Sequence, residues 1–445
     1  MKTYKSKCDK FICVLLFFVI IISSLGIGCK KEITIPSSPI SAYELESLME
    51  SFNNNDVSWD SFRTIISDSL NYKVVYDWAS SHVGNNTTAQ FLLGRCYERG
   101  EGVEKNLSKA VELYTKAADQ GYAPAQCYLG ICYEDGEGVE KNLSKAVELY
   151  TKAADQGYAP AQCYLGRRYV MGEGVEKNLS KAVELFTKAA DQGNALGQCC
   201  LGVCYQNGEG VEKNLSKAVE LFTKAADQGN AWAQCKLGRC YERGEGVEKN
   251  LPKAVELYTK AADQGNAQGQ YFLGICYQNG EGVEKNLSKA VELYTKAADQ
   301  GDDWAQCKLG TCYQNGEGVE KNVSKAVELY TKAADQDISY AQFLLGNCYF
   351  NGNGVDRNFN TAVKWFSKAA DNGQKIAQYQ LGYCYEMGLG IENNDTTAFE
   401  WYKKSADQGY NEAILKVAQC YRDGFGVKMN PEMAKKWFDL AKQTK

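Results

Sequence analysis

The sequence predicts an all-α protein: an α/α solenoid of ten 36-residue helix-pair repeats behind a small N-terminal helical cap. The first observation is that "GEGVEKNLSKAVELYTKAADQG" begins at Gly100 and returns almost letter for letter every 36 residues as far as Gly316. The second is that repeats counted from Ala89 fill residues 89–445 without a change of period. The third is that each repeat holds two apolar stretches at helical spacing, separated by glycines.

Residues 1–28 have the features of a signal peptide, because lysines precede the apolar run 11–22 and small residues follow it. Gly28 and Cys29 resemble a bacterial lipobox, although Gly26 stands where a leucine is usual. The resemblance implies cleavage before Cys29 and a lipid on its thiol. We therefore expect a lipid-attachment cysteine and linker over residues 29–41, and a membrane-anchored lipoprotein of the cell envelope that faces the periplasm or the exterior. An uncleaved signal anchor and a soluble secreted form are the alternatives.

Residues 42–88 are predicted to form the N-terminal cap. Three stretches within residues 42–83 place apolar side chains on one helical face. The last of them, "VVYDWASS", does so with Val75, Trp78 and Ala79. We therefore expect about three helices that cover the N-terminal end of the repeats in residues 89–445.

The first helix of each repeat is illustrated by repeat two, which starts at Ala125. Ala125, Leu129, Cys132 and Tyr133 form an apolar stripe at helical spacing. Gly136 and the glycine two residues later are expected to end this helix, because glycine adopts the left-handed conformation of a helix C-cap.

The second helix is expected to begin at an asparagine N-cap, Asn142, and to end at Gly157. Glu148 and Lys152 form an i, i+4 pair on its solvent side. The residues predicted to lie in the core are Ala146, Val147, Leu149, Tyr150, Ala153 and Ala154.

The composition excludes several kinds of chemistry. His82 is the single histidine and lies outside the repeats, so neither a Ser-His-Asp triad nor an HExxH zinc site can be built within them. The formal net charge of −5 argues against nucleic acid as a partner, because phosphate binding needs clustered Lys and Arg. "GEGVEK" could suggest a phosphate loop, but it lies between two helices and recurs at every turn. We expect no enzyme activity, no cofactor and no bound metal.

Eighteen cysteines in an exported chain would ordinarily indicate disulfides. Nine first helices, however, carry cysteine at the same core position, the eighth of the repeat. Equivalent positions in stacked helices lie roughly 8–10 Å apart, which is too far for a bridge. We therefore predict that these thiols are small buried hydrophobic groups. Cys199, Cys200 and Cys204 form a local cluster, but without a fourth ligand it is a weak metal signal.

The repeat resembles the Sel-one-like repeat (SLR), a tetratricopeptide-like α/α family. The family pattern of Ala, LGxxY, GxGV, Ala and YxKAAxxG stands here as "AQCYLGICYEDGEGVEKNLSKAVELYTKAADQG". The resemblance covers residues 89–445 and implies a right-handed superhelix with the first helices on its concave surface. It also implies an interaction scaffold. In a cysteine-rich branch of the family, position 3 bridges to a cysteine in the "KAA" stretch, where this chain has Ala118, Ala154 and Ala190.

The leading hypothesis is therefore a non-enzymatic protein–protein interaction scaffold, anchored to the bacterial cell envelope by its lipid, that binds a protein or peptide in the concave groove. The alternative is a binder of small molecules or cell-wall ligands, or a weak β-lactamase-like hydrolase, as catalogued for cysteine-rich relatives. That alternative is disfavoured because the repeats lack the disulfide pairs of that branch and an SxxK nucleophile motif.

Differences among the repeats concentrate on one face of the first helix, whereas the second helix hardly varies from repeat one to repeat seven. With the first alanine or glycine of each repeat as position 1, positions 0, 4, 7 and 11 share this face. We predict that it contacts the partner, because Arg, Tyr and Trp are favoured at binding hot spots. Weaker packing constraint on the first helix is the alternative explanation. The predicted partner-binding residues are Arg95, Tyr128, Tyr164, Arg167, Trp232, Lys236, Arg239, Phe272, Trp304, Lys308 and Tyr340.

Overall fold

The computed structural model describes residue 45 and residues 71–443, and this part of the chain contains helices and no strands. It divides into two compact units, residues 1–156 and 157–445. The helices of the first unit are α4 (Tyr72–His82), α5 (Thr87–Arg99), α6 (Leu107–Asp119), α7 (Ala123–Asp135) and α8 (Leu143–Asp155). The helices of the second unit are α9 (Ala159–Met171), α10 (Leu179–Asp191), α11 (Ala195–Asn207), α12 (Leu215–Asp227), α13 (Ala231–Arg243), α14 (Leu251–Asp263), α15 (Ala267–Asn279), α16 (Leu287–Asp299), α17 (Asp303–Asn315), α18 (Val323–Ala334), α19 (Ser339–Asn351), α20 (Phe359–Asp371), α21 (Lys375–Met387), α22 (Asp395–Asp407), α23 (Asn411–Asp423) and α24 (Pro431–Gln443).

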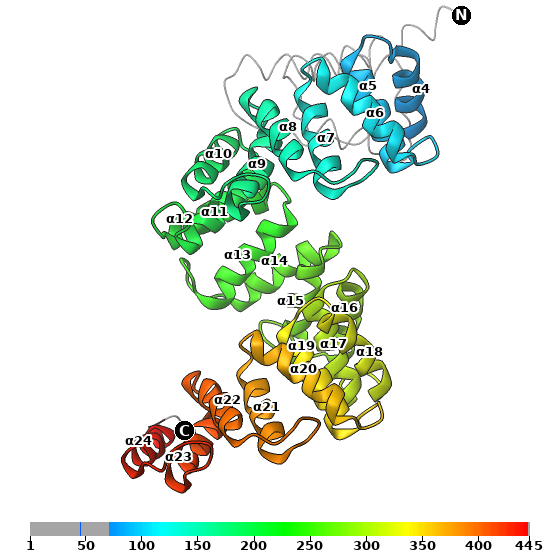
Figure 1. Cartoon of the computed structure of the whole chain (residues 1–445). Helices are drawn as coiled ribbons and strands as arrows, with labels where there is room; N and C mark the ends of the chain where they lie inside the picture. The colour runs from blue at the N-terminus through cyan, green and yellow to red at the C-terminus, as the bar shows by residue number, and fades with distance from the viewer. Residues whose placement is uncertain (1–44, 46–70, 444–445) are drawn as a thin grey trace, which may run out of the picture. The chain divides into compact units, whose positions relative to one another are not determined.

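Within each unit, every helix packs against the helix before it and the helix after it (Figure 1). The odd-numbered helices from α5 onward are the first helices of the ten repeats, and the even-numbered helices from α6 onward are the second helices. The predicted all-α solenoid of helix pairs is confirmed.

The helix boundaries follow the predicted capping residues. In repeat two the first helix ends at Gly136, which has the left-handed φ of 79°. The second helix begins after Asn142, whose side-chain oxygen accepts a hydrogen bond of 3.0 Å from the backbone N–H of Lys145. Gly157, with φ 83°, follows its end. The same caps recur in the other repeats because the same residues recur there, except that Asp337 takes the place of the last glycine in repeat seven.

The predicted core is also observed. In repeat two, Ala125, Leu129 and Cys132 are buried, and so are all the predicted residues of the second helix except Val147, which is half-buried. Gly130 explains how closely the two helices approach: a Cβ there would lie 2.6 Å from the ring of Tyr150. Glycine in the LGxxY segment is therefore required by the aromatic ring that packs on it.

The tyrosine at this core position also has a polar partner. The Tyr150 hydroxyl donates to the carboxylate of Glu134 at 2.8 Å, and Tyr258 donates to Glu242 at 2.7 Å. In repeat eight a phenylalanine, Phe366, takes the tyrosine position, and the glutamate position is also apolar. In repeat eight no buried hydroxyl is therefore left that needs a hydrogen-bond partner.

Glutamine at position 2 of the first helix joins successive repeats. Five of these side chains donate to an alanine carbonyl of the preceding second helix at 3.1–3.4 Å, as Gln234 does to Ala226. Each also accepts from the residue at position 32 of its own repeat, as Gln234 does from Gln264 at 2.8 Å. The connection depends on contacts between repeats and is not evident from the pattern of one repeat.

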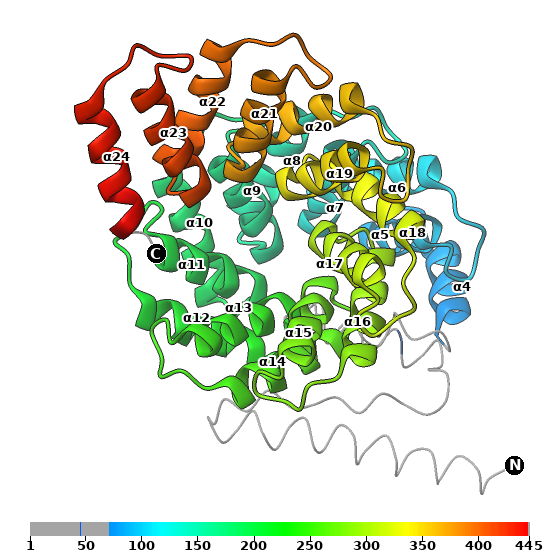
Figure 2. The same ribbon diagram turned by 90° about the horizontal axis from the view of Figure 1, so that it is seen from below.

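In the second unit, from α11 to α18, the first helices lie toward the inside of the curved array and the second helices lie toward its outside (Figure 2). The first helices, which carry the variable face, therefore lie on the inner side of this array, as the resemblance to the SLR family implied.

Helix α4 lies within the residues of the predicted cap, and its Val75, Trp78 and Ala79 are buried. Leu45 is helical and buried, and it belongs to the same apolar cluster as α4 and α5. The remainder of the predicted cap, the signal peptide, the linker and Cys29 lie outside the described residues. None of the helices in the described part of the chain is both long enough and apolar enough to span a membrane.

Candidate partner-binding surface

We call positions 0, 4, 7 and 11 of the first helices the first-helix stripe. In repeat five the stripe consists of Trp232, Lys236, Arg239 and Arg243, all on α13. The first three are half-buried and Arg243 is exposed. The stripe is therefore accessible in this repeat, although its side chains also contact one another.

Stripe residues of repeat one are buried, in contrast to the accessible stripe of repeat five. Arg95 is only 6% exposed, and Leu92 is also buried. The guanidinium of Arg95 donates to the hydroxyl of Tyr128 and lies 4.6 Å from the centre of that ring. Position 7 is buried here because the first helix of the next repeat presents an aromatic ring to it. The prediction that Arg95 faces a partner is corrected, since an inward-directed guanidinium is not available at the surface.

The contact between position 7 and position 4 of the next repeat recurs along the stripe. Arg239 lies 5.3 Å from the ring centre of Phe272. Arg167 is close enough to Cys200 to favour its thiolate, although burial dominates and raises the pKa of Cys200 to about 12. The stripe thus forms a ridge across successive first helices, in which cations pack on the residues of the following repeat.

The most exposed aromatic residues of the stripe lie at position 0 of repeats seven and eight. Trp304 is 47% exposed and Tyr340 is 39% exposed, both at position 0. Lys308, one turn further along α17, is half-buried, as are Tyr164 on α9 and Tyr128 on α7. Trp304 and Tyr340 are therefore the stripe positions at which a large aromatic side chain is most accessible to another molecule.

The polar residues of the second helices have partners within the chain. In six repeats the lysine two residues after the first residue of the second helix lies 4.5–5.1 Å from the ring centre of a tyrosine on the first helix, as Lys217 does over Tyr205. In repeats one to six a glutamate and lysine pair along the exposed face, as Glu220 and Lys224 do at 2.6 Å. These contacts within the chain explain why the lysine and glutamate positions of the second helix hardly vary among the repeats.

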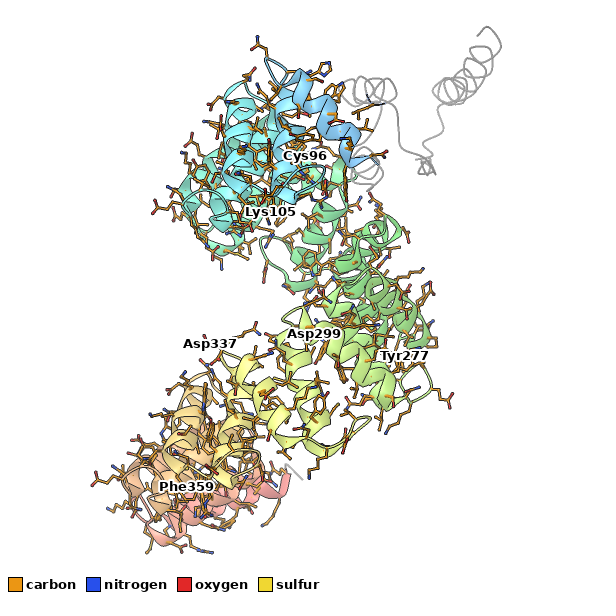
Figure 3. The ribbon with its side chains drawn as sticks, turned by 90° about the vertical axis from the view of Figure 1, so that its right-hand side faces the viewer. Cys96, Lys105, Tyr277, Asp299, Asp337 and Phe359 are labelled. Atoms are coloured by element: carbon orange, nitrogen blue, oxygen red, sulfur yellow. The ribbon has the colours of Figure 1, made fainter. Side chains whose placement is uncertain are left out.

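The fifteen cysteines of the described residues are all buried and unbridged, as predicted. Burial raises the pKa of the thiols, for example to about 12 in Cys96, which lies among the helices of the first unit (Figure 3). A thiol with such a pKa is protonated at neutral pH and is a poor nucleophile. Within the described residues no three His, Cys, Asp or Glu side chains are grouped so that they could hold a metal ion.

A cavity of about 360 Å³ lies beside the stripe where repeats four and five meet. Repeat four contributes Gln206, Asn207, Lys213 and Leu215, and repeat five contributes Lys236, Arg239, Arg243 and Glu245. A second cavity, of about 370 Å³, is lined by α10, α11 and α12, and its charged residues include the Glu220–Lys224 pair. The first cavity therefore has an excess of positive charge that the second lacks.

Sequence reasoning identified Lys236 and Arg239 but missed Lys213 and Arg243. Lys213 belongs to "GEGVEK", which is the same in most repeats, so variation gave no signal for it. Arg243 occupies position 11 of the stripe and could have been included on that ground alone. The structure brings both side chains to the same cavity as the two predicted ones.

The fold and its surface define a class of protein: a solenoid of helix pairs in which the core and the second helices are uniform and the first helices vary. Within that class the chain belongs to the Sel1 repeat family. The family model, described as Sel1 repeat, matches residues 87–122, 123–158, 159–194, 195–230, 233–266, 267–302, 305–338, 339–374, 375–410 and 411–443. Proteins of this family are generally interaction scaffolds and generally non-catalytic.

Several known proteins are similar to this chain. The structure of c5321, a protective antigen of uropathogenic Escherichia coli strains, is 33% identical, covers 84% of this chain and 89% of that chain, and has a TM-score of 0.46. A Sel1 repeat protein from Oxalobacter formigenes is 32% identical over 55% of this chain and 96% of that chain, with a TM-score of 0.48. DAP3-binding cell death enhancer 1 from Rattus norvegicus is 44% identical over 52 residues, and the match spans 12% of this chain and 10% of the rat protein.

Proposed function

We propose that the chain is a non-enzymatic scaffold that binds a protein or peptide partner along the first-helix stripe. The observation that carries the proposal is the contrast between the two helices of each repeat. The second helices use lysines in contacts with tyrosines of the first helices of the same chain, whereas the stripe varies and leaves Trp304 and Tyr340 exposed. Trp and Tyr, and the Arg that the stripe carries in repeats three and five, are residues favoured at interface hot spots.

We also propose that the protein is attached to the bacterial cell envelope through a lipid on Cys29. The support is the lysine-flanked apolar run followed by Gly28–Cys29 in the sequence. Metabolic labelling with a clickable fatty acid should mark the wild-type protein and not the Cys29→Ala variant. Equal labelling of the two proteins would contradict the lipid attachment and favour a signal anchor or secretion.

Site-specific photo-cross-linking in cells tests the partner-binding surface. A photoreactive amino acid at Trp304 or Tyr340 should give discrete cross-linked products. The same amino acid at Glu292, on the exposed face of the second helix α16, is the matched control and should give none. Products of similar yield from both helices would overturn the assignment of the partner to the stripe.

A variant set provides an independent test. Replacing Arg167, Trp232, Arg239 and Trp304 with alanine should reduce the affinity for the partner identified by cross-linking about tenfold, which corresponds to about 1.4 kcal/mol. The melting temperature should change little, because none of these side chains is in the buried core. Replacement of Glu148 and Glu220 should have no effect on either quantity.

Turnover of nitrocefin that one substitution abolishes would instead support the hydrolase alternative.

A further inference from the structure

The cavity between repeats four and five has an unbalanced charge. Four of its lining side chains are cationic and one, Glu245, is a carboxylate. Glu245 is already engaged: it accepts a hydrogen bond from Gln206 at 3.3 Å and lies 3.6 Å from the guanidinium of Arg243. The remaining cations, Lys213, Lys236 and Arg239, form no ion pair with any of the described residues.

Two of these cations are held by aromatic rings. The ammonium of Lys236 lies 5.5 Å from the ring centre of Trp232, and Arg239 lies 5.3 Å from that of Phe272. An aromatic ring orients a cation without neutralising its charge, in contrast to a carboxylate. Both charges therefore remain available to a ligand in the cavity. Burial and the neighbouring Arg239 lower the pKa of Lys236, which indicates that these cations are crowded and partly desolvated.

The walls of the cavity are fixed by backbone contacts. The loop of repeat five approaches the start of α12 so closely that a Cβ on Gly246 would overlap the carbonyl of Leu215. The Cβ of Lys213 likewise lies over Gly208, the C-cap residue of α11. The backbone that carries the cationic side chains is thus closely packed at the repeat junction, so ordering of the backbone costs little free energy when a ligand binds.

The junction between repeats six and seven has the same construction with different charges. Lys308 corresponds to Lys236, but Thr311 and Asn315 stand where Arg239 and Arg243 stand in repeat five. Asn315 donates to Glu317 at 3.0 Å, so it takes over the contact that Arg243 makes with Glu245. The extra positive charge of repeat five is therefore not needed to build the junction.

We propose that the cavity lined by Lys213, Lys236, Arg239 and Arg243 binds carboxylates of an acidic peptide segment. The proposal rests on the scaffold function above and specifies the chemistry of the partner. Arginine pairs with carboxylates through two parallel hydrogen bonds, and lysine adds point charges. A volume of about 360 Å³ lies at the low end for ligand sites, which suits a few side chains of a peptide.

The test measures binding of a fluorescent hexaglutamate peptide to the purified repeat-containing chain by anisotropy, with hexaglutamine as the uncharged comparison. The variant R239T/R243N gives repeat five the residues of repeat seven, so it should fold as the wild type does. It should weaken hexaglutamate binding about tenfold or more, because charge-assisted hydrogen bonds are lost. The control K260T/K296N removes the same net charge from second helices and should change the affinity less than about twofold.

Each other outcome overturns the proposal. Equal weakening by both variants would assign binding to the overall charge, and absence of hexaglutamate binding to the wild type would exclude the site. Displacement of the peptide by inorganic phosphate, at a concentration at which acetate has no effect, would assign the cavity to phosphate. Cross-linking from Trp304 does not depend on this cavity, so these failures are distinguishable from failure of the scaffold function.

Discussion

Repeat five (residues 233–268) and repeat seven (residues 305–340) share their core and differ at their surface. Ala233, Leu237 and Cys240 are buried in repeat five, and alanine, leucine and cysteine are buried at the same positions of repeat seven. On the first-helix stripe, however, repeat five carries Arg239 and Arg243 where repeat seven carries threonine and asparagine. Position 33 differs as well, because repeat seven has aspartate in place of glycine.

The comparison shows that a tandem repeat separates two kinds of constraint. Core positions face the same neighbours in every repeat, so packing admits few residues there. Stripe positions must satisfy only the next first helix and the solvent, so their charge can change without disturbing the fold. Binding properties can therefore be specified at one junction and not at another within the same architecture.

The largest expected effect comes from deletions. Removal of residues 233–268 or of residues 305–340 should leave a folded protein, because the helices of a repeat contact mainly their neighbours in the chain. Only the first deletion should abolish hexaglutamate binding, since it removes half of the cationic cavity. Circular dichroism melting and anisotropy would measure the two effects.

A deletion of 35 residues, 233–267, is the control for the period. It leaves one extra residue at the new junction between repeats four and six, so the core residues on the two sides of that junction are out of register and the protein should be less stable than the 36-residue deletion. Similar melting curves for the 35-residue and 36-residue deletions would contradict the solenoid of equivalent repeats.

Alkaline pH should destabilise both repeats equally. Burial raises the pKa of Cys240 and of Cys312 to about 11, whereas an unfolded thiol titrates near its ordinary value of about 8.5. The unfolded chain therefore loses protons first, so this stability is fully present below about pH 8.5 and decreases as the pH rises toward 11. Each thiol accounts for a decrease of order 2 kcal/mol.

Calorimetric melting between about pH 8 and pH 11 would measure this dependence. The variants C240A and C312A should each reduce its steepness by the same amount. A marked difference between them would show that the two repeats do not have equivalent cores.

Transfer of charge to repeat seven should create a second site. The variant T311R/N315R adds two arginines beside Lys308, and the loop residue Lys285 corresponds to Lys213. Isothermal titration with hexaglutamate should then give two sites per chain instead of one. The affinity of the junction between repeats six and seven for hexaglutamate should rise about tenfold over that of the unsubstituted junction, which corresponds to about 1.4 kcal/mol. A stoichiometry that stays at one would mean that charge alone does not distinguish the two junctions.

The smallest effect concerns position 33. Asp337, labelled in Figure 3, has a φ of 61° and is the single non-glycine residue with positive φ among the described residues, whereas Gly265 of repeat five has a φ of 80°. A Cβ on Gly265 would meet no atom within 4 Å, so the backbone conformation is the main penalty. We expect D337G to stabilise the protein by about 0.5–1 kcal/mol and G265D to destabilise it similarly. Chemical denaturation would measure both changes, and the same sign for the two variants would contradict this explanation.

Much of the fold could be predicted because its signals are local. Asn142 and Gly136 specify helix ends through their own backbone and side-chain chemistry, and the apolar period specifies which face is buried. These properties repeat with the sequence, so a single correct repeat yields all the others.

The surface could be predicted only in part because it depends on contacts between repeats. Arg95 has the sequence of an exposed stripe residue, yet the ring of Tyr128 from the next repeat covers it. Lys213 belongs to a loop of one repeat and meets Arg239 of the next across a cavity. No pattern within one helix contains that information.

The glutamine at position 2 gives the chain a direction of assembly. Gln234 needs the carbonyl of Ala226, which belongs to the repeat before it, and Gln90 of repeat one uses Val83 and Gly84 beside α4 in the same way. Loss of a repeat from the C-terminus leaves no such amide without its acceptor, whereas loss of α4 together with the two residues that follow it deprives Gln90 of both acceptors. A chain that emerges from the ribosome with its N-terminus first therefore offers each new repeat a finished docking edge, so the array can grow one helix pair at a time during synthesis.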